Sequence, residues 1–94
     1  MTKIKVLDFH AKWCGPCRAM GPAIESLMEE HNSEGSDIEI LKIDVDTNPE
    51  LTEKYNIRSI PTLVFLKDEE EFDRKSGVQT KDKIVEKINE ALSV

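Results

Sequence analysis

Both cysteines of this 94-residue chain lie in one short stretch, Trp13-Cys14-Gly15-Pro16-Cys17. The stretch falls where the apolar pattern changes from that of a strand to that of a helix, so it predicts a strand–helix junction. Two cysteines with this spacing at the start of a helix can either form a disulfide or bind a soft metal ion. Which of these two states applies decides the function of the chain.

Apolar periodicity along the rest of the chain predicts an alternation of strands and helices. The predicted strands cover residues 3–9, 38–45, 63–66 and 71–76. The predicted helices cover residues 14–31, a short segment capped by Asn48 and begun by Pro49, and the residues after Thr80. The order β-α-β-α-β-β-α indicates one α/β domain spanning residues 1–94.

The connections predict how the sheet is arranged. The two strand–helix–strand units imply right-handed crossovers, which would make their strands parallel neighbours. The acid run Asp68-Glu69-Glu70 is interpreted as a solvated turn into an antiparallel edge strand, with Phe72 pointing inward. We expect a four-stranded mixed sheet with helices on both faces. The apolar stripes expected to face it are Met20, Ala23, Ile24, Leu27 and Met28 in the first helix and Ile84, Val85, Ile88, Ala91 and Leu92 in the last.

The charge balance and the absence of long apolar runs exclude several classes of partner. The net charge of −6 argues against nucleic acid and anionic membranes, because both require basic patches. No apolar run approaches the roughly 20 residues of a membrane span. Residues 1–5 lead directly into a strand without a signal-peptide core, so the expected compartment is a reducing cytoplasm. Two cysteines in that compartment are more often redox-active or metal-binding than structural.

The position of the cysteine pair predicts two different thiols. Cys14 at the helix N-terminus faces unsatisfied N–H groups and the positive end of the helix dipole, which favour a thiolate. We expect a pKa for Cys14 below the free value of about 8.5, so that it attacks while the more shielded Cys17 keeps its proton. Gly15 lets another chain approach closely, and Pro16 stiffens the turn.

Asp8 is the second unusual residue, because it interrupts the apolar strand between Leu7 and Phe9. Burial would raise its pKa, and a carboxyl ionising near neutrality could take a proton from Cys17, through a water molecule. The alternative is an aspartate that faces solvent at a sheet edge. Lys42 on the next strand is a candidate counter-charge for Asp8, and a solvated lysine is its alternative.

The stretch from Trp13 to Cys17, together with Asp8, Ile60-Pro61-Thr62 and Ser76-Gly77 in this order, resembles the thioredoxin family over the chain from residue 3 onward. The resemblance implies a thioredoxin fold and a protein-disulfide reductase. It implies that Cys14 is the nucleophile, Cys17 the resolving thiol, Asp8 the family's buried acid, Lys42 its partner and Pro61 a cis-proline packed against the disulfide.

The resemblance also implies the partners of the chain. An extended client peptide would pair with the backbone of Ile60 as a strand does. The client-docking surface would consist of Trp13, Gly15, Pro16, Ile60, Pro61, Gly77 and Val78, although Trp13 has core packing as its alternative. The implied protein is a monomer with no cofactor beyond its own disulfide. A flavin- and NADPH-dependent reductase would be its electron donor, and disulfide-containing proteins would be its clients.

Three features depart from the family's pattern. The extra strand and helix with which many members begin are not present, so we expect one sheet edge to lack cover. His10 stands where the family usually has a second tryptophan, and it could titrate and couple to Cys14 or simply pack as a ring. Ser59 replaces the glycine that usually precedes Ile-Pro.

Three other functions fit parts of the sequence. A glutaredoxin-like, glutathione-dependent enzyme has the same cysteine spacing but usually the sequence Cys-Pro-Tyr-Cys. A binding module could hold zinc through Cys14, Cys17, His10 and His31, although His31 lies about 20 Å along the helix. A thioredoxin-like interaction subunit could carry a redox-idle cysteine pair.

Overall fold

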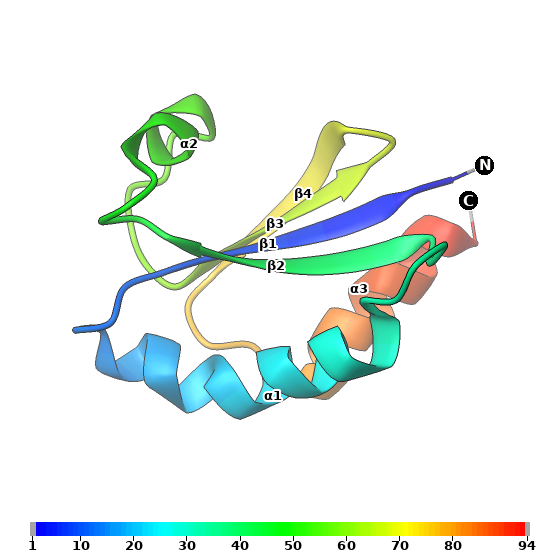
Figure 1. Cartoon of the computed structure of the whole chain (residues 1–94), viewed down its shortest axis with the longest axis horizontal. Coiled ribbons are helices and arrows are strands. Elements are labelled where there is room, and N and C mark those ends of the chain that lie inside the picture. The colour runs from blue at the N-terminus through cyan, green and yellow to red at the C-terminus, as the bar shows by residue number, and fades with distance from the viewer. Residues whose placement is uncertain (1, 94) are drawn as a thin grey trace.

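Strands and helices alternate along residues 2–93, which are the residues described by this computed structural model (Figure 1). The elements are β1 (Ile4–His10), α1 (Gly15–His31), β2 (Ile38–Asp44), α2 (Pro49–Lys54), β3 (Thr62–Lys67), β4 (Glu70–Ser76) and α3 (Lys81–Leu92). The predicted order of elements is confirmed. None of the helices within residues 2–93 has the length and hydropathy of a membrane crossing.

The four strands form a mixed sheet in the order β2-β1-β3-β4. β1 and β2 are parallel, whereas β3 is antiparallel to both β1 and β4. The prediction that β2 and β3 are parallel neighbours is therefore wrong. With six residues, α2 is about 9 Å long and remains near the carboxyl end of β2, so the chain enters β3 from that end (Figure 1).

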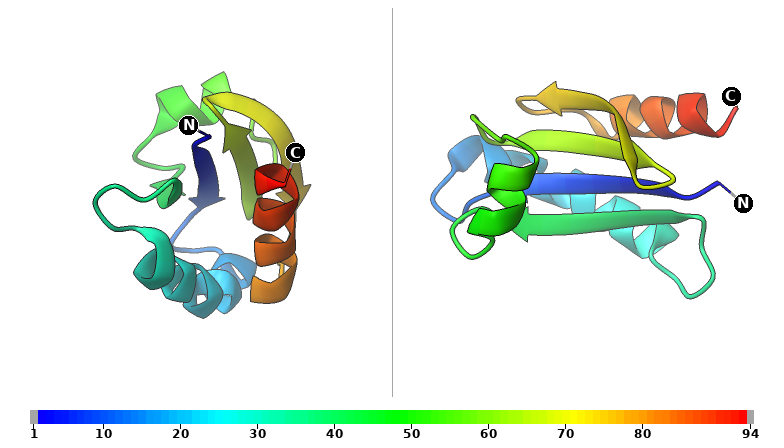
Figure 2. Two further views of the ribbon diagram at one scale, coloured as in Figure 1. Left: turned by 90° about the vertical axis from the view of Figure 1, so that its right-hand side faces the viewer. Right: turned by 90° about the horizontal axis from the view of Figure 1, so that it is seen from above.

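Helices cover both faces of the sheet, as predicted. α1 and α3 lie side by side under one face, and α2 lies over one end of the other (Figures 1 and 2). α1 buries Met20, Ile24 and Leu27, which recur at helical spacing and pack on Val6 and Phe65 of the sheet. The smaller core under α2 is formed by Leu7, Phe9, Ile43, Val64 and Leu66, with Leu51 and Tyr55 packed against it.

Two apolar side chains are more exposed than expected. Phe72 contacts Phe65, with ring centroids 6.1 Å apart, but remains 39% exposed because β4 is an edge strand. Leu92 is the last residue of α3 and is 43% exposed. The predicted cap of this helix is confirmed, since the Thr80 hydroxyl accepts the N–H of Lys83 at 3.2 Å.

β2 forms the other edge of the sheet, but side chains occupy part of its outer backbone. The Asn32 amide accepts the N–H of Ile40 at 2.7 Å and donates to the Ile40 carbonyl at 2.6 Å. The Ser36 hydroxyl likewise accepts the N–H of Ile38 at 3.1 Å and donates to the Ile38 carbonyl at 2.9 Å. The expectation of an uncovered edge is therefore only partly met, because these side chains replace a neighbouring strand at two positions.

Candidate active site

The antiparallel pairing of β1 with β3 brings the two cysteines close to Ile60, the residue before Pro61. Thr62, the first residue of β3, pairs with Phe9 near the carboxyl end of β1. The residues just outside these strand ends therefore meet beside the N-terminus of α1. Cys14, Cys17 and Ala11 form a small buried cluster there, against which Ile60 and Val45 pack.

Cys14 and Cys17 form a disulfide, with their Cα atoms 5.2 Å apart. Cys14 is the N-cap residue of α1, and its sulfur accepts the N–H of Cys17 at 3.2 Å. A sulfur at this position also faces the positive end of the helix dipole, which stabilises a thiolate when the bond is reduced. Of the two states that the sequence left open, the structure shows the disulfide.

The two cysteines do not differ in burial. Cys14 is 5% exposed and Cys17 is 7% exposed, so the greater shielding expected for Cys17 is not present in the disulfide state. The two residues differ instead in their position on the helix. The sulfur of Cys14 caps the first turn, whereas Cys17 lies within α1 and supplies the N–H that this sulfur accepts.

Asp8 is 2% exposed on β1, and its Oδ1 atom has no hydrogen-bond partner among the described residues. Burial raises the pKa of this carboxyl above its ordinary value, while the nearby charges of His10 and Lys42 act in the opposite direction. The structure thus places Asp8 inside the molecule, on the face of the sheet that α1 covers, rather than at a solvated edge.

A cavity of about 390 Å³ connects Asp8 with Cys17 and with solvent. Its inner wall includes Asp8 and Cys17, and its outer rim includes exposed residues of α1 such as Arg18 and Glu25. The residues that line it are Asp8, His10, Ala11, Lys12, Cys17, Arg18, Gly21, Pro22, Glu25 and Lys42. A polar cavity of this size has room for water between the carboxyl and the sulfur.

Lys42 lies opposite Asp8 in the register of β1 and β2, as expected, but its ammonium group has a different partner. Its Nζ atom lies 3.8 Å from the Glu25 carboxylate of α1, and the structure shows no ion pair between Lys42 and Asp8. Lys42 and Asp8 therefore do not form a direct ion pair. The Lys42 charge still acts on Asp8 from a distance and offsets part of the increase in the pKa of Asp8 that burial causes.

Of the residues predicted to dock a client, Ile60 packs against the cysteine cluster, and most of the others are exposed. Trp13 is 68% exposed and Val78 51%, which excludes core packing for Trp13. Pro61 is buried, and the Ile60–Pro61 peptide bond is cis. The N–H of Gly77 donates to the Pro61 carbonyl at 2.8 Å and so holds the β4–α3 loop against this segment. Gly15, Pro16 and Gly77 are exposed, and Ile60 is half-buried.

The sequence analysis missed Asp46, which orients the exposed indole. The Trp13 Nε1–H group donates to Asp46 Oδ2 at 2.9 Å. Val45, just before it, donates its N–H to the His10 carbonyl at 2.9 Å. A signal was available, because the carboxyl ends of parallel strands meet at one end of a sheet, and Asp46 follows β2 as Trp13 follows β1.

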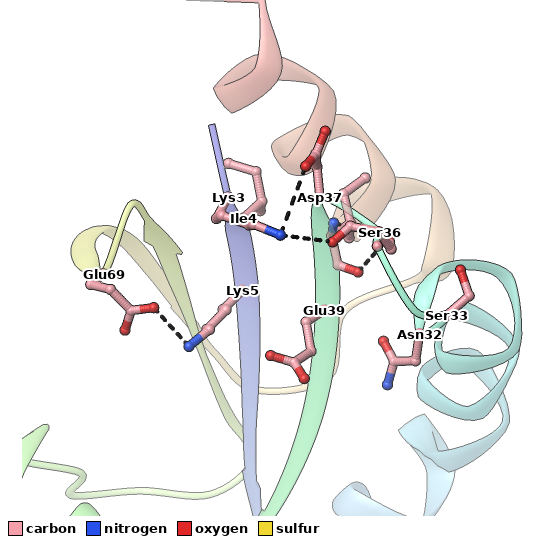
Figure 3. Close-up of a pocket in the computed structure, with 11 residues that line it drawn as sticks. Lys3, Ile4, Lys5, Asn32, Ser33, Ser36, Asp37, Glu39 and Glu69 are labelled. Carbon is pink, nitrogen blue, oxygen red and sulfur yellow. Dashed lines mark hydrogen bonds and ion pairs between the residues drawn. The ribbon is translucent and has the colours of Figure 1, made fainter. Parts of the chain in front are cut away.

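A larger cavity, of about 500 Å³, lies at the opposite end of the sheet (Figure 3). Four of its charged groups form two pairs: Lys5 Nζ lies 2.7 Å from Glu69, and Lys3 Nζ lies 3.9 Å from Asp37. No cysteine lines this cavity. It is therefore not part of the redox site.

A zinc site formed by Cys14, Cys17, His10 and His31 does not fit the positions of these residues. Within residues 2–93, no three or more His, Cys, Asp or Glu side chains cluster in a way that could hold a metal ion. His31 is the last residue of α1, a helix of 17 residues that begins directly after Cys14. At 1.5 Å per residue, His31 lies about 21 Å along the helix from Cys17 and about 25 Å from Cys14.

Comparison with known proteins gives one consistent result. A family model described as Thioredoxin matches residues 1–90. The thioredoxin of Staphylococcus epidermidis is 40% identical over 89 residues, which cover 95% of this chain and 83% of that protein. The thioredoxin of Rickettsia bellii is 42% identical over 84 residues, covering 89% of this chain and 77% of that protein. The X-ray structure of Fasciola hepatica thioredoxin superposes with a TM-score of 0.82 at 42% identity, covering 95% of this chain and 81% of that one.

Proposed function

The chain belongs to the thioredoxin family and is a dithiol–disulfide oxidoreductase, and from this we propose that it reduces disulfides in client proteins through a mixed disulfide on Cys14. The observation that carries this proposal is the sulfur of Cys14 at the N-cap of α1, bonded to Cys17 one turn further along. This geometry supplies a stabilised thiolate and a second thiol within bonding reach.

The first step is attack by the reduced protein on its client. The Cys14 thiolate attacks one sulfur of the client disulfide, so that a Cys14–client bond forms and the client's own S–S bond breaks. The client's second sulfur leaves as a thiolate and takes a proton from solvent. The helix N-terminus favours this step because it keeps Cys14 ionised near neutral pH.

The second step resolves the mixed disulfide. The Asp8 carboxylate removes the proton of the Cys17 thiol through water in the 390 Å³ cavity, and the Cys17 thiolate attacks the sulfur of Cys14. The Cys14–Cys17 bond forms, the Cys14–client bond breaks, and the client leaves reduced. The raised pKa of Asp8 supports this role, because a base that ionises closer to neutrality accepts a proton more readily.

The surface around the disulfide supports docking of an extended client segment. The backbone N–H and carbonyl of Ile60 have no hydrogen-bond partner within residues 2–93. A client strand could therefore pair with Ile60, next to the cis peptide bond before Pro61. Trp13, Gly15 and Pro16 would contact the client on one side, and Gly77 and Val78 on the other.

Regeneration requires a separate electron donor. The sequence carries no glycine-rich dinucleotide fingerprint, and the proposed donor of electrons to the cysteine pair is a thioredoxin-reductase-type flavoprotein. We propose that the protein acts as a monomer, as one domain of residues 1–94, in a reducing cytoplasm. The net charge of −6 supports protein clients rather than nucleic acid or membranes.

Trapping of clients tests the proposal directly. In Cys17→Ser the first step proceeds and the second cannot, so mixed disulfides through Cys14 should accumulate on non-reducing gels with an insulin substrate. Cys14→Ser, the matched control, should trap none. Insulin reduction should be sustained by thioredoxin reductase and NADPH. If glutathione alone sustains it, the enzyme is of the glutaredoxin class, and if Cys17→Ser traps no client, the cysteine pair is redox-idle.

A further inference from the structure

The mechanism above leaves Asp8 with a proton that it must release before the next turnover. The carboxyl is 2% exposed, and its Oδ1 atom has no partner among the described residues. A buried carboxyl that contacts solvent so little needs an intermediate group, or an ordered water, to exchange its proton. The cavity beside Asp8 is therefore the place to look for such a group.

His10 also lines this cavity. It follows Asp8 by two positions on β1, so both side chains point to the same face of the sheet. Both residues line the 390 Å³ cavity together with Cys17. Asp8 is buried, whereas His10, at the end of the strand, is half-buried. The cavity thus brings a buried carboxyl and a half-buried imidazole together.

The other charged groups that face this cavity are less suited to accept the proton. Lys42 of β2 carries an ammonium group, which has no acceptor atom, and its Nζ lies 3.8 Å from Glu25. The Arg18 guanidinium of α1 also lacks an acceptor, and it donates to the Lys12 carbonyl at 2.7 Å. The Glu25 carboxylate belongs to the exposed surface of α1 and is held by Lys42.

Two further charged groups complete the surroundings of His10. Lys12 follows it in the loop before α1 and, like Lys42, has no acceptor in its ammonium form. Asp44 pairs with His10 in the register of β1 and β2, but its Oδ1 atom accepts the N–H of Asp46 at 2.9 Å. The imidazole of His10, in contrast to these ammonium and guanidinium groups, has ring nitrogens that can accept a proton and donate one.

We propose that His10 accepts the proton that Asp8 has taken from Cys17 and passes it to solvent. This inference rests on the proposed function, because it supplies a further residue to the same step. His10 acts through Asp8 rather than on a sulfur. It is therefore a positioning residue, which helps Asp8 to release its proton. The proton moves from the Cys17 thiol to Asp8, then through water to the imidazole, and finally to solvent, where the departing client thiolate takes one up. No electron is transferred in this relay.

The electrostatics of the pair agree with this arrangement. Burial has the largest effect on the pKa of Asp8 and raises it. The nearby charge of His10 has the second largest effect and lowers this pKa. A protonated imidazole therefore weakens Asp8 as a base and has no acceptor for its proton. Both effects should slow resolution when the imidazole is protonated.

The two chemical steps can be timed separately with the chromogenic disulfide dithiobis(nitrobenzoate). Attack by Cys14 releases one nitrothiobenzoate and resolution by Cys17 releases the second, so a stopped-flow trace gives both rates. In His10→Gln, which keeps a polar side chain of similar size, we expect resolution at neutral pH to slow about tenfold while attack is unchanged. This is less than the ~10²–10⁴-fold effect of removing a direct acid–base group.

Chemical rescue separates proton transfer from a packing effect. In His10→Ala, added imidazole should restore the resolution rate, and the fall in rate toward acidic pH should be smaller than in the wild type. His31→Gln, a change to the chain's other histidine at the far end of α1, is the control and should leave both phases unchanged.

The outcomes distinguish this inference from the proposed function. If the wild type shows no second release, or if Cys17→Ser shows the same second release, the proposed function fails. If wild-type resolution depends on Cys17 but His10→Gln resolves at the wild-type rate, only the relay is overturned. Slow resolution in the His10 variants that neither imidazole nor pH alters also overturns it, because that result indicates packing alone.

Discussion

At the scale of single residues, Asp8 is the group that the fold least explains. A buried polar atom without a hydrogen bond destabilises a folded protein by roughly 1–3 kcal/mol, and a buried charge by more. Oδ1 of Asp8 is such an atom within residues 2–93, and the apolar neighbours of Asp8 along β1, Val6, Leu7 and Phe9, are buried. A carboxyl kept at this position despite its cost supports a role in accepting the proton of Cys17.

Asp8→Asn should therefore increase the stability of the protein while slowing its resolution of the mixed disulfide. Burial raises the pKa of Asp8 in the folded chain above its unfolded value near 3.9. The stability associated with the protonated carboxyl is thus complete below that value and is lost as the pH rises through the folded pKa. We expect Asp8→Asn to have the higher free energy of unfolding at neutral pH, with the two proteins converging toward about pH 4.

Urea unfolding at a series of pH values measures this difference, and equal pH dependence in the two proteins would contradict it. The same variant should slow resolution about 10²-fold and leave attack nearly unchanged. The defect should shrink as the pH approaches the free thiol value of about 8.5, because Cys17 then ionises without a base.

At the scale of elements, α1 and the loop after it protect the edge of β2. Strand edges with free N–H and carbonyl groups promote pairing with other chains. Asn32, the C-cap residue of α1, closes both backbone groups of Ile40, and Ser36 closes both of Ile38. The same helix thus presents the cysteines at one end and shields a strand at the other.

Asn32→Ala should expose this edge. The loss of two hydrogen bonds to Ile40, at about 1 kcal/mol each, predicts a decrease of about 2 kcal/mol in the free energy of unfolding. The opened edge should also make the protein self-associate with increasing concentration, as measured by analytical ultracentrifugation. Ser33→Ala, a change to the neighbouring exposed residue, should do neither. An Asn32→Ala protein that matches Ser33→Ala in both measurements would show that the side chain does not protect β2.

The elements also show what could be predicted from the sequence. Apolar periodicity and the stretch from Trp13 to Cys17 are local signals, and they predicted the order of elements and the position of the cysteines at a helix start. The direction of β3 depends on where the chain emerges from the short helix α2, and no local sequence pattern encodes that position. The Lys42–Glu25 pair depends on the rotation of α1 against the sheet, and the Asn32–Ile40 bonds depend on the course of a loop.

At the scale of the whole molecule, the disulfide is one of several attachments of α1. The buried face of α1 packs into the larger core with Ile84 and Ile88 of α3. The Lys81 ammonium of α3 also donates to Ser26 at 2.8 Å and to Glu30 at 2.6 Å. The fold should therefore remain intact when the disulfide opens, as a carrier that changes redox state repeatedly requires.

Reduction should lower stability by a limited amount. A disulfide that closes so short a loop contributes about 2 kcal/mol in the chain-entropy model, which corresponds to roughly 10 °C in Tm for a domain of this size. Calorimetry of oxidised and reduced protein measures the shift, and the double variant Cys14→Ser/Cys17→Ser should unfold near the reduced protein. Loss of the far-UV helical signal on reduction would show instead that the disulfide holds α1 in place.

The hydrogen bond between Trp13 and Asp46 has a practical consequence. The chain contains a single tryptophan, and it precedes the reactive sulfur directly. All indole fluorescence therefore originates at this one position, whose ring is 68% exposed and oriented by Asp46. A change in emission during turnover reports on the vicinity of the disulfide and on nothing else in the chain, so the protein can be followed in real time without an attached dye.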